Sequence, residues 1–192
     1  MNWDELPGLF PALAEPERWL PLLKAHLAYI AEAGEHTRVT AVAPDVAIQL
    51  KWPNDVLSAN GRKLCGILLE RAGDAIIAGF GINLVWHPAN IGRPVSDLRA
   101  LGGNPPEAQA VCEVLAEQFA SWLQKWRQQP LANLLRAWEA AAHPKGTALR
   151  VNLPDGEQVD GLFAGLGDDG ALSLRLADGA IRAIHAADIF LI

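Results

Sequence analysis

The sequence predicts an α+β fold in which a mixed sheet with helices is followed by a small all-β segment. Three observations lead to this prediction. Runs of Val, Ile and Leu interrupted by glycines occupy residues 46–85, two helical patterns follow residue 107, and short strand-like runs separated by turns fill the end of the chain. With 192 residues, 51% hydrophobic and 20% charged, the chain can form one ordinary core and a small second domain.

Each element of the first part follows from its own pattern. Apolar residues recur at helical spacing over 17–33, which predicts an amphipathic helix. Alternating apolar residues over 46–50 predict a strand, and Pro53 ends regular pairing soon after it. The apolar runs 63–70 and 75–85 are joined by a short polar link, which predicts an antiparallel hairpin.

The second part begins with a long loop. Residues 86–106 are rich in proline and glycine and lack periodicity, and a loop of this length in a compact domain predicts a lid. Helical spacing then resumes on both sides of Pro130. Beyond Gly146, turns recur through a meander of about five short strands, the size of an SH3-like barrel. We therefore expect two domains, 1–145 and 146–192.

Charge and cysteine content exclude several classes of function. A formal net charge of -6 with no basic stripe argues against a nucleic-acid binder. The N-terminus carries acidic residues where a signal peptide needs bases, and its apolar run is interrupted by charges, so neither export nor membrane insertion is expected. Cys65 and Cys112 are too few for a disulfide framework; a reducing cytoplasm and a core position for both thiols are predicted. The five histidines lack ligand spacing, which disfavours zinc.

Three short blocks carry the chemistry. Residues 51–55 read Lys-Trp-Pro-Asn-Asp, residues 63–70 read Lys-Leu-Cys-Gly-Ile-Leu-Leu-Glu, and residues 79–83 read Gly-Phe-Gly-Ile-Asn. Together they combine charged or amide groups, glycines and strand-like runs, as in a site for a phosphorylated ligand built on a sheet.

In order and spacing these blocks resemble the biotin protein ligases, which adenylate biotin and pass it to a lysine of a carboxylase carrier domain. The resemblance covers about 46–192 and implies a biotin/lipoate ligase-like sheet with a C-terminal SH3-like barrel. It also implies biotin, ATP and Mg²⁺ as ligands and a biotin carboxyl carrier domain as partner, and it leaves a homodimer open.

The resemblance makes Lys63 the leading catalytic residue, because its family counterpart contacts the biotin carboxyl and the adenylate phosphate. The alternative is a solvated lysine at a strand edge. The loop before it is one residue longer than in the best-known bacterial member, so the assignment to Arg62 or Lys63 is open by one position. Lys51 offers a second positive charge. Asn54 and Asp55 either bind Mg²⁺ through water or order the loop by side-chain to backbone hydrogen bonds.

The remaining candidates have weaker signals. Gly66, Gly79 and Gly81 allow close approach of the backbone to a ligand, whereas a lone strand glycine is more often a bulge. Asn83 matches the family asparagine near the nucleotide phosphates and the metal, with a strand-terminal turn as the alternative. Trp86 is a candidate to cover an adenine ring, and Trp52 is expected to pack in the core.

One family feature is missing. An arginine- and glycine-rich loop of the type Gly-Arg-Gly-Arg-Arg-Gly precedes the first block in the family, whereas here only Arg18 and Arg38 precede Lys51. We therefore expect a catalytic domain truncated at its N-terminus that alone transfers biotin poorly. Two alternatives stay open: a non-catalytic remnant that binds a carrier or dimerises through its sheet, and a relative of lipoate or octanoyl transferases, which lack the first block.

Overall fold

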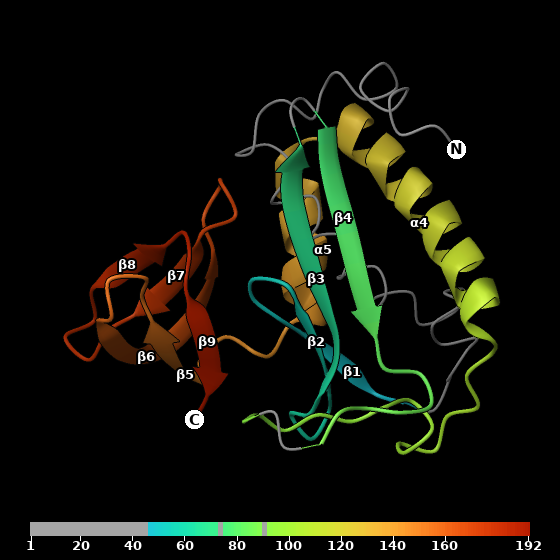
Figure 1. Ribbon diagram of the computed structural model, residues 1–192. Helices are drawn as coiled ribbons and strands as arrows, with labels where there is room; N and C mark the ends of the chain where they lie inside the picture. The colour runs from blue at the N-terminus through green and yellow to red at the C-terminus, as the bar shows by residue number, and fades with distance from the viewer. Residues whose placement is uncertain (1–45, 73–74, 90–91) are drawn as a thin grey trace.

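The computed structural model describes residues 46–72, 75–89 and 92–192. The helix predicted over 17–33 lies outside these residues. The described part contains two antiparallel sheets and two long helices, in agreement with the predicted α+β class (Figure 1).

The first sheet has the strand order β1-β2-β3-β4. Its strands are β1 (Ile48–Lys51), β2 (Asp55–Ser58), β3 (Lys63–Ala72) and β4 (Ala75–Ile82). The predicted first strand and the predicted β3–β4 hairpin are confirmed. All four strands pair antiparallel, and parallel pairing in the described residues is limited to two isolated bridges. The pairing among the four described strands is thus antiparallel throughout.

Strand β2 was not predicted from the sequence. Its apolar run, Val56-Leu57, is only two residues long and lies between the Pro-Asn-Asp turn and a second turn formed by 58–62. That second turn is closed by hydrogen bonds from Ser58 N to Arg62 O (2.8 Å) and from Gly61 N to Ser58 O (2.9 Å), with Gly61 at φ +76°. Because the run is so short, periodicity does not distinguish it from the turns around it.

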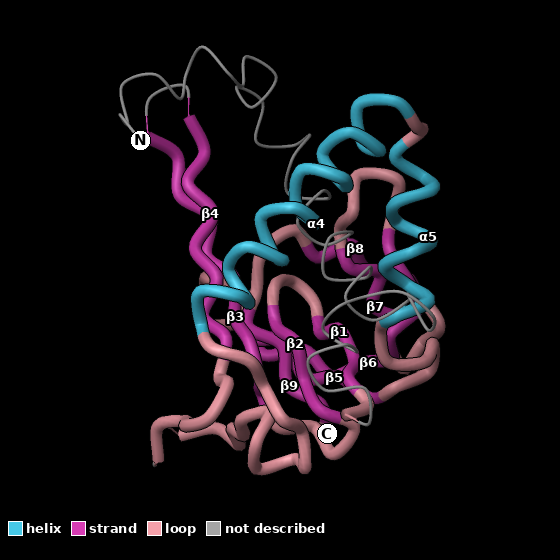
Figure 2. The backbone as a smooth tube through the Cα atoms, turned by 90° about the vertical axis from the view of Figure 1, so that its right-hand side faces the viewer, coloured by secondary structure: helices cyan, strands magenta, loops and turns pink. Residues whose placement is uncertain are grey.

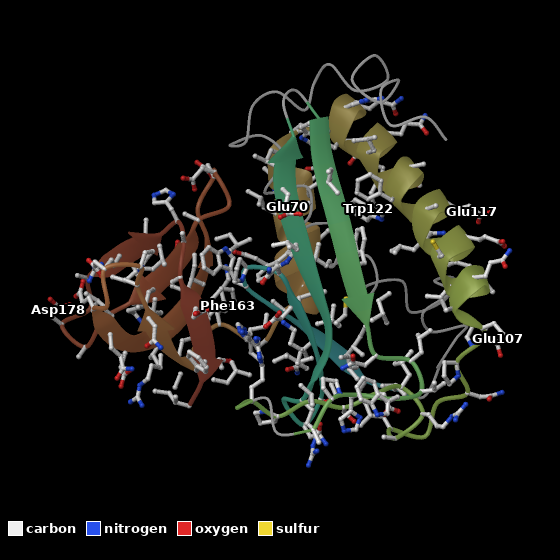
Figure 3. All side chains as sticks on the ribbon, viewed as in Figure 1. Glu70, Glu107, Glu117, Trp122, Phe163 and Asp178 are labelled. Carbon is white, nitrogen blue, oxygen red and sulfur yellow. The ribbon has the colours of Figure 1, made fainter. Side chains whose placement is uncertain are left out.

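Both helices lie on one side of the β3–β4 hairpin (Figure 2). They are α4 (Ala108–Gln128) and α5 (Leu131–Ala141), as the helical spacing predicted. Phe80 of β4 meets Phe119 of α4 edge to face, with ring centroids 6.3 Å apart. Trp122, labelled in Figure 3 between α4 and β4, is buried and packs with Leu134 of α5. Among the described residues, no helix lies on the opposite face of the hairpin (Figure 2).

The second sheet has the order β8-β7-β6-β5-β9 and is antiparallel throughout. Its strands are β5 (Ala148–Asn152), β6 (Gln158–Leu166), β7 (Leu172–Arg175), β8 (Ile181–Ile184) and β9 (Asp188–Leu191). The five predicted strands are confirmed, and β5 to β8 form the predicted meander, with Gly156, Gly170 and Gly179 at positive φ in its turns. The last strand differs from the prediction, because β9 returns to pair with β5. The predicted barrel is corrected in one respect: β8 and β9 are the two edges of the ladder, so the hydrogen-bonded sheet is not closed.

One hydrophobic core joins the two sheets. Trp52 from the β1–β2 turn and Trp138 from α5 are fully buried and belong to the same cluster as Phe163 of β6. Trp138 and Phe163 rings meet edge to face at 6.4 Å, and Phe163 is labelled in Figure 3 on the side of the second sheet that faces α5. Trp52 Nε1 also donates a hydrogen bond to Gly170 O (3.2 Å). The expectation that Trp52 packs is therefore confirmed. The predicted domain boundary falls in the link between α5 and β5, and the division into domains stays a prediction.

The loop after β4 is irregular but partly buried. The described residues of 86–106 form no helix or strand, as predicted. Val95, Ser96, Asp97 and Leu98 are nevertheless buried. Asp97 accepts a hydrogen bond from Ala100 N (2.7 Å) and contacts His87 Nδ1 at 2.6 Å. Lys63 N donates to Pro94 O and Ser96 N to Lys63 O, each at 3.0 Å, so this stretch is anchored to the sheet, and its action as a lid stays a prediction.

The two cysteines differ in environment. Cys65 is buried on β3, as predicted, whereas Cys112 on α4 is exposed, which contradicts the predicted core position. Helical periodicity alone did not show which face of α4 Cys112 occupies. In the part of the chain that the structure describes, no helix is both long and apolar enough to cross a membrane.

Candidate anion-binding site at the edge of the first sheet

A buried carboxylate organises the candidate site. Asp55 begins β2, opposite Lys51 of β1 and Gly66 of β3, and is 4% exposed. Lys51 Nζ lies 3.0 Å from Asp55 Oδ2, and Lys63 Nζ pairs with Asp55 Oδ1. A carboxylate withdrawn from water needs such partners, because an unpaired buried charge is strongly unfavourable. The structure thus brings together the predicted residues Lys51, Asp55 and Lys63.

Lys63 is held at this position by its own backbone and by a glycine beneath its side chain. Lys63 N donates to Pro94 O and Lys63 O accepts from Ser96 N, each at 3.0 Å, which pairs the start of β3 with the long loop. A Cβ atom added to Gly66 would lie 2.7 Å from Lys63 Nζ. Since real Cβ contacts are not that short, the lysine ammonium occupies space that any side chain at position 66 would take.

The structure places Arg62 and Lys63, the two candidates for the catalytic position, in different surroundings. Arg62 is exposed, and its N–H donates to Ser58 Oγ (3.1 Å) within the β2–β3 turn. Lys63, one residue later, is the side chain that reaches Asp55. The catalytic role of Lys63 remains a proposal.

Lys51 also links the two sheets. Its Nζ donates a hydrogen bond to Ile189 O of β9 (2.7 Å), and its side chain is 13% exposed. Together with its ion pair to Asp55, this contact joins the edge strand of the second sheet to the carboxylate that holds Lys63. Lys51 therefore has a structural role that the sequence motif did not indicate.

Two cavities meet at this cluster. The larger has a volume of about 530 Å³ and lies between the first sheet and β9, with Lys51, Asp55, Lys63, Arg93, Asp188 and Phe190 in its lining. The smaller, of about 180 Å³, is lined by Lys63, Gly66, Gly81, Asn83, Arg93 and Val95. Among the described residues, Lys63 and Arg93 are the two whose side chains line both cavities. Arg93 belongs to no motif, and the sequence offered no signal for it.

The predicted glycines divide into two groups. Gly66 and Gly81 are paired across β3 and β4, so they share a face of the sheet and line the smaller cavity. Gly79 pairs with Leu68 further along the hairpin and lines neither cavity. The structure therefore brings two of the three glycines to one place, and not all three.

The amide side chains fix the backbone around the site. Asn54 Nδ2 donates to Ile67 O (2.6 Å) and Ile67 N donates to Asn54 O (3.0 Å), so Asn54 orders the motif by hydrogen bonds, one of its two predicted roles. Asn83 Nδ2 donates to Ser96 O (2.9 Å) and also faces the smaller cavity. Trp86 is 72% exposed and lines neither cavity, so the structure does not bring it into the site.

The charges of the cluster favour an anionic ligand. Lys51 and Lys63 pair with Asp55, and Arg93 Nη1 lies 4.0 Å from Asp55 Oδ2. The three cations around Asp55 leave an excess of two formal positive charges, which Asp188 in the lining of the larger cavity reduces to one. In such a partly enclosed site electrostatic interactions are stronger than in bulk water.

A thiol nucleophile does not fit this site. Burial raises the pKa of the Cys65 thiol to about 12, against a smaller lowering by Lys63 and a small further rise from Asp55. A protonated thiol is a poor nucleophile, so Cys65 serves as a core residue at neutral pH.

Magnesium does not fit this site as a protein-held ion. The described residues contain no group of three His, Cys, Asp or Glu side chains able to hold a metal. Both oxygens of Asp55 face lysine ammonium groups, and Asn83 lines a different cavity from Asp55. A hard cation needs several oxygen ligands, which these residues do not supply.

Comparison of this chain with known proteins shows the family to which it is related. Residues 150–192 match the family model described as biotin protein ligase C terminal domain. Over 181 residues the chain is 32% identical to the biotin–[acetyl-CoA-carboxylase] ligase of Paracoccus denitrificans, a match that covers 88% of this chain and 74% of the relative. The chain belongs to the biotin protein ligase family.

A second relative and two solved structures agree with this assignment. The ligase of the same name from Mycobacterium tuberculosis is 32% identical over 154 residues, which are 78% of this chain. That match spans only 57% of the relative's length. The apo structure of biotin protein ligase from Aquifex aeolicus has a TM-score of 0.76 at 21% identity, covering 92% of this chain and 77% of that one. The same Aquifex protein in complex with biotin and ATP gives 0.75 at 22% identity, covering 94% and 76%. These likenesses confirm the biotin ligase fold.

Proposed function

We propose that this chain is a biotin–[carboxyl-carrier protein] ligase of the cytoplasm, which forms biotinyl-5'-AMP from biotin and MgATP and transfers the biotinyl group to a carrier-domain lysine. The observation that carries the proposal is the position of Lys63, which pairs with a buried carboxylate at the junction of two cavities. The names of the related proteins and the structure of a relative with biotin and ATP support the same choice.

The first half-reaction needs positive charge at one point. A carboxylate oxygen of biotin attacks the α-phosphorus of ATP, a P–O bond forms, and the bond to the β-phosphate breaks to release pyrophosphate. Two anions must approach and charge moves to the leaving group, so a fixed cation stabilises the transition state more than the separate reactants. In the proposed mechanism Lys63 supplies this charge, and Asp55 and Gly66 fix its position.

The product of this step has a shape that suits two cavities. An acyl adenylate is a phosphate with an acyl arm on one side and a nucleoside on the other. A phosphate beside Lys63 would allow one arm to extend into each cavity. Asn83, at the smaller cavity, and Lys51 and Asn54, at the larger, would contact the arms or keep the surrounding backbone in place.

The second half-reaction transfers the acyl group. The neutral amine of a carrier lysine attacks the acyl carbon, the C–O bond to AMP breaks, and the nitrogen loses a proton as the amide forms. The same Lys63 charge stabilises AMP as it leaves. Magnesium is proposed to arrive with ATP as the MgATP substrate, because the described residues do not form a metal site of their own.

A biotin-dependent exchange of labelled pyrophosphate into ATP tests the proposal, since it reports adenylate formation without a carrier. Lys63→Ala should lower the exchange rate by about 10² to 10³, the usual effect of removing one electrostatic group. Arg62→Ala, the matched loss of charge one residue away, should change it only a few fold. Because only Arg18 and Arg38 precede Lys51, the exchange rate of the wild-type chain alone is expected to be low. Equal loss in both variants, or no exchange even after a Gly-Arg-Gly-Arg-Arg-Gly segment is supplied ahead of Lys51, would contradict the proposal. Streptavidin detection of a carrier domain then reports the transfer step.

A second candidate function rests on the face of the hairpin that neither of the described helices covers. Leu68 and Ile77 are 60% and 43% exposed on the face away from the helices, which favours an interaction module that dimerises there or binds a carrier. Sedimentation equilibrium of wild type and Leu68→Glu tests it, with Ile181→Glu on the second sheet as control. A monomer in all three proteins, together with no carrier binding, would remove this candidate.

A further inference from the structure

Of the three cations around Asp55, which are Lys51, Lys63 and Arg93, only Arg93 lies outside the three sequence blocks. It lies in the loop after β4 and, with Lys63, lines both cavities. Its side chain is 52% exposed, and its Nη1 is 4.0 Å from Asp55 Oδ2. That distance is too long for a hydrogen bond, so the guanidinium interacts with Asp55 through charge alone.

The backbone around Arg93 is held beside Lys63. Pro94 O accepts a hydrogen bond from Lys63 N, and Ser96 N donates one to Lys63 O, each at 3.0 Å. Val95 between them is buried and forms an isolated parallel bridge with Lys63. The loop therefore carries Arg93 to the start of β3 by main-chain pairing, and the side chain alone must still be ordered when a ligand binds.

The side chains of Lys51, Lys63 and Arg93 differ in how far they are already engaged by oxygens of the protein. Lys51 is shared between Asp55 and Ile189 O, and Lys63 pairs with Asp55. Arg93 lines both cavities, its side chain is 52% exposed, and its Nη1 is 4.0 Å from Asp55 Oδ2, beyond hydrogen-bond distance. A guanidinium can also bind two oxygens of one phosphate at once, which an ammonium cannot do with the same geometry.

We propose that Arg93 binds the phosphate of a nucleoside-linked acyl phosphate opposite Lys63, so that the phosphate lies between an ammonium and a guanidinium at the junction of the cavities. This inference rests on the proposed function and adds a residue that determines phosphate recognition.

Calorimetric binding to the full chain tests the inference with two ligands: biotinyl-5'-AMP, and a biotin–adenosine conjugate joined by a neutral linker of similar length. Arg93→Gln should weaken binding of the phosphate-linked ligand about 10- to 100-fold, as expected for lost charge-assisted hydrogen bonds. Arg93→Lys should recover only part of this, because the fork geometry is lost. Arg99→Gln, on the same loop, exposed and outside both cavities, is the matched control and should bind like wild type.

The ligand with the neutral linker distinguishes recognition of the phosphate by Arg93 from a structural effect of the substitution. Its affinity should be the same for wild type and Arg93→Gln, since it has no phosphate to lose. Equal affinity of Arg93→Gln and Arg99→Gln for biotinyl-5'-AMP, with wild type binding well, would overturn the inference and leave the proposed function intact. Equal loss with both ligands would also overturn it, because the effect would then be structural. Failure of wild type to bind biotinyl-5'-AMP would overturn the proposed function itself.

Discussion

At the scale of single residues, the site depends on a glycine as much as on its charges. The Lys63 ammonium lies only 2.7 Å from the position that a Cβ atom of residue 66 would take, so the need for glycine here comes from another side chain and not from its own backbone angles. The sequence suggested that Gly66 allows a ligand to approach. The structure adds that the first group to use this space is the proposed catalytic lysine.

Gly66→Ala should therefore impair the reaction without unfolding the protein. The added methyl displaces the flexible end of Lys63 from Asp55, and a displacement of about 1 Å can cost about 10² in rate. Biotin-dependent pyrophosphate exchange measures the rate, and thermal unfolding measures stability. Gly79→Ala is the matched control, because the nearest atom to its added Cβ is at 3.8 Å. Equal activity in the two variants would show that Lys63 tolerates the methyl.

Residue types alone revealed part of this site. Lys51, Asp55 and Lys63 were predictable because their motifs stand out in the sequence, and the structure brings them together. Arg93 was not predictable, because it reaches the site through hydrogen bonds between a loop and the first residue of β3. Such pairing leaves no periodic pattern in the sequence.

At the scale of elements, β9 is connected to the site by Lys51. Its Nζ contacts both Ile189 O and Asp55, so the edge of the second sheet and the start of β2 share one ammonium group. The hairpin and the helices were predictable from long regular patterns. Strand β2 and the open β8 and β9 edges were not, because they depend on short runs and on pairing between distant segments.

Lys51→Met should loosen this connection while keeping the apolar stem of the side chain. We expect a loss of about 1 to 3 kcal/mol in the free energy of unfolding, since a hydrogen-bonded, mostly buried charge is removed and Asp55 loses a partner. Urea unfolding measures this loss, and amide exchange over 188–191 should become faster. Lys145→Met removes an ion pair whose lysine side chain is 60% exposed, and it should lower the free energy of unfolding by less than about 1 kcal/mol. Equal effects would argue against a special role for Lys51.

At the scale of the whole molecule, the shared core makes the two sheets depend on each other. His143 lies in the link between α5 and β5, is 3% exposed, and packs edge-on to Phe163 at 4.9 Å. Neither ring nitrogen has a hydrogen-bond partner within the described part of the molecule. Burial, with a smaller effect of nearby Lys51, lowers the pKa of His143 below its ordinary 6.5.

This lowered pKa predicts a pH dependence of stability. Well above pH 6.5, His143 is neutral in both the folded and the unfolded chain and contributes no pH dependence. As the pH falls below that value, the unfolded chain binds the proton first, so the free energy of unfolding decreases. Urea unfolding between pH 7 and 5 should show this decrease in wild type and in His185→Gln, whose histidine is exposed, and a smaller one in His143→Phe. Identical slopes in all three proteins would contradict the assignment to His143.

The central claim is that Lys63 and the two cavities beside it form the binding site of an acyl adenylate. A crystal structure of the chain with biotinyl-5'-AMP tests this most directly. We expect a phosphate oxygen about 3 Å from Lys63 Nζ, with the biotinyl and adenosyl arms in separate cavities. A ligand bound elsewhere on the molecule, with Lys63 still paired only to Asp55, would contradict it.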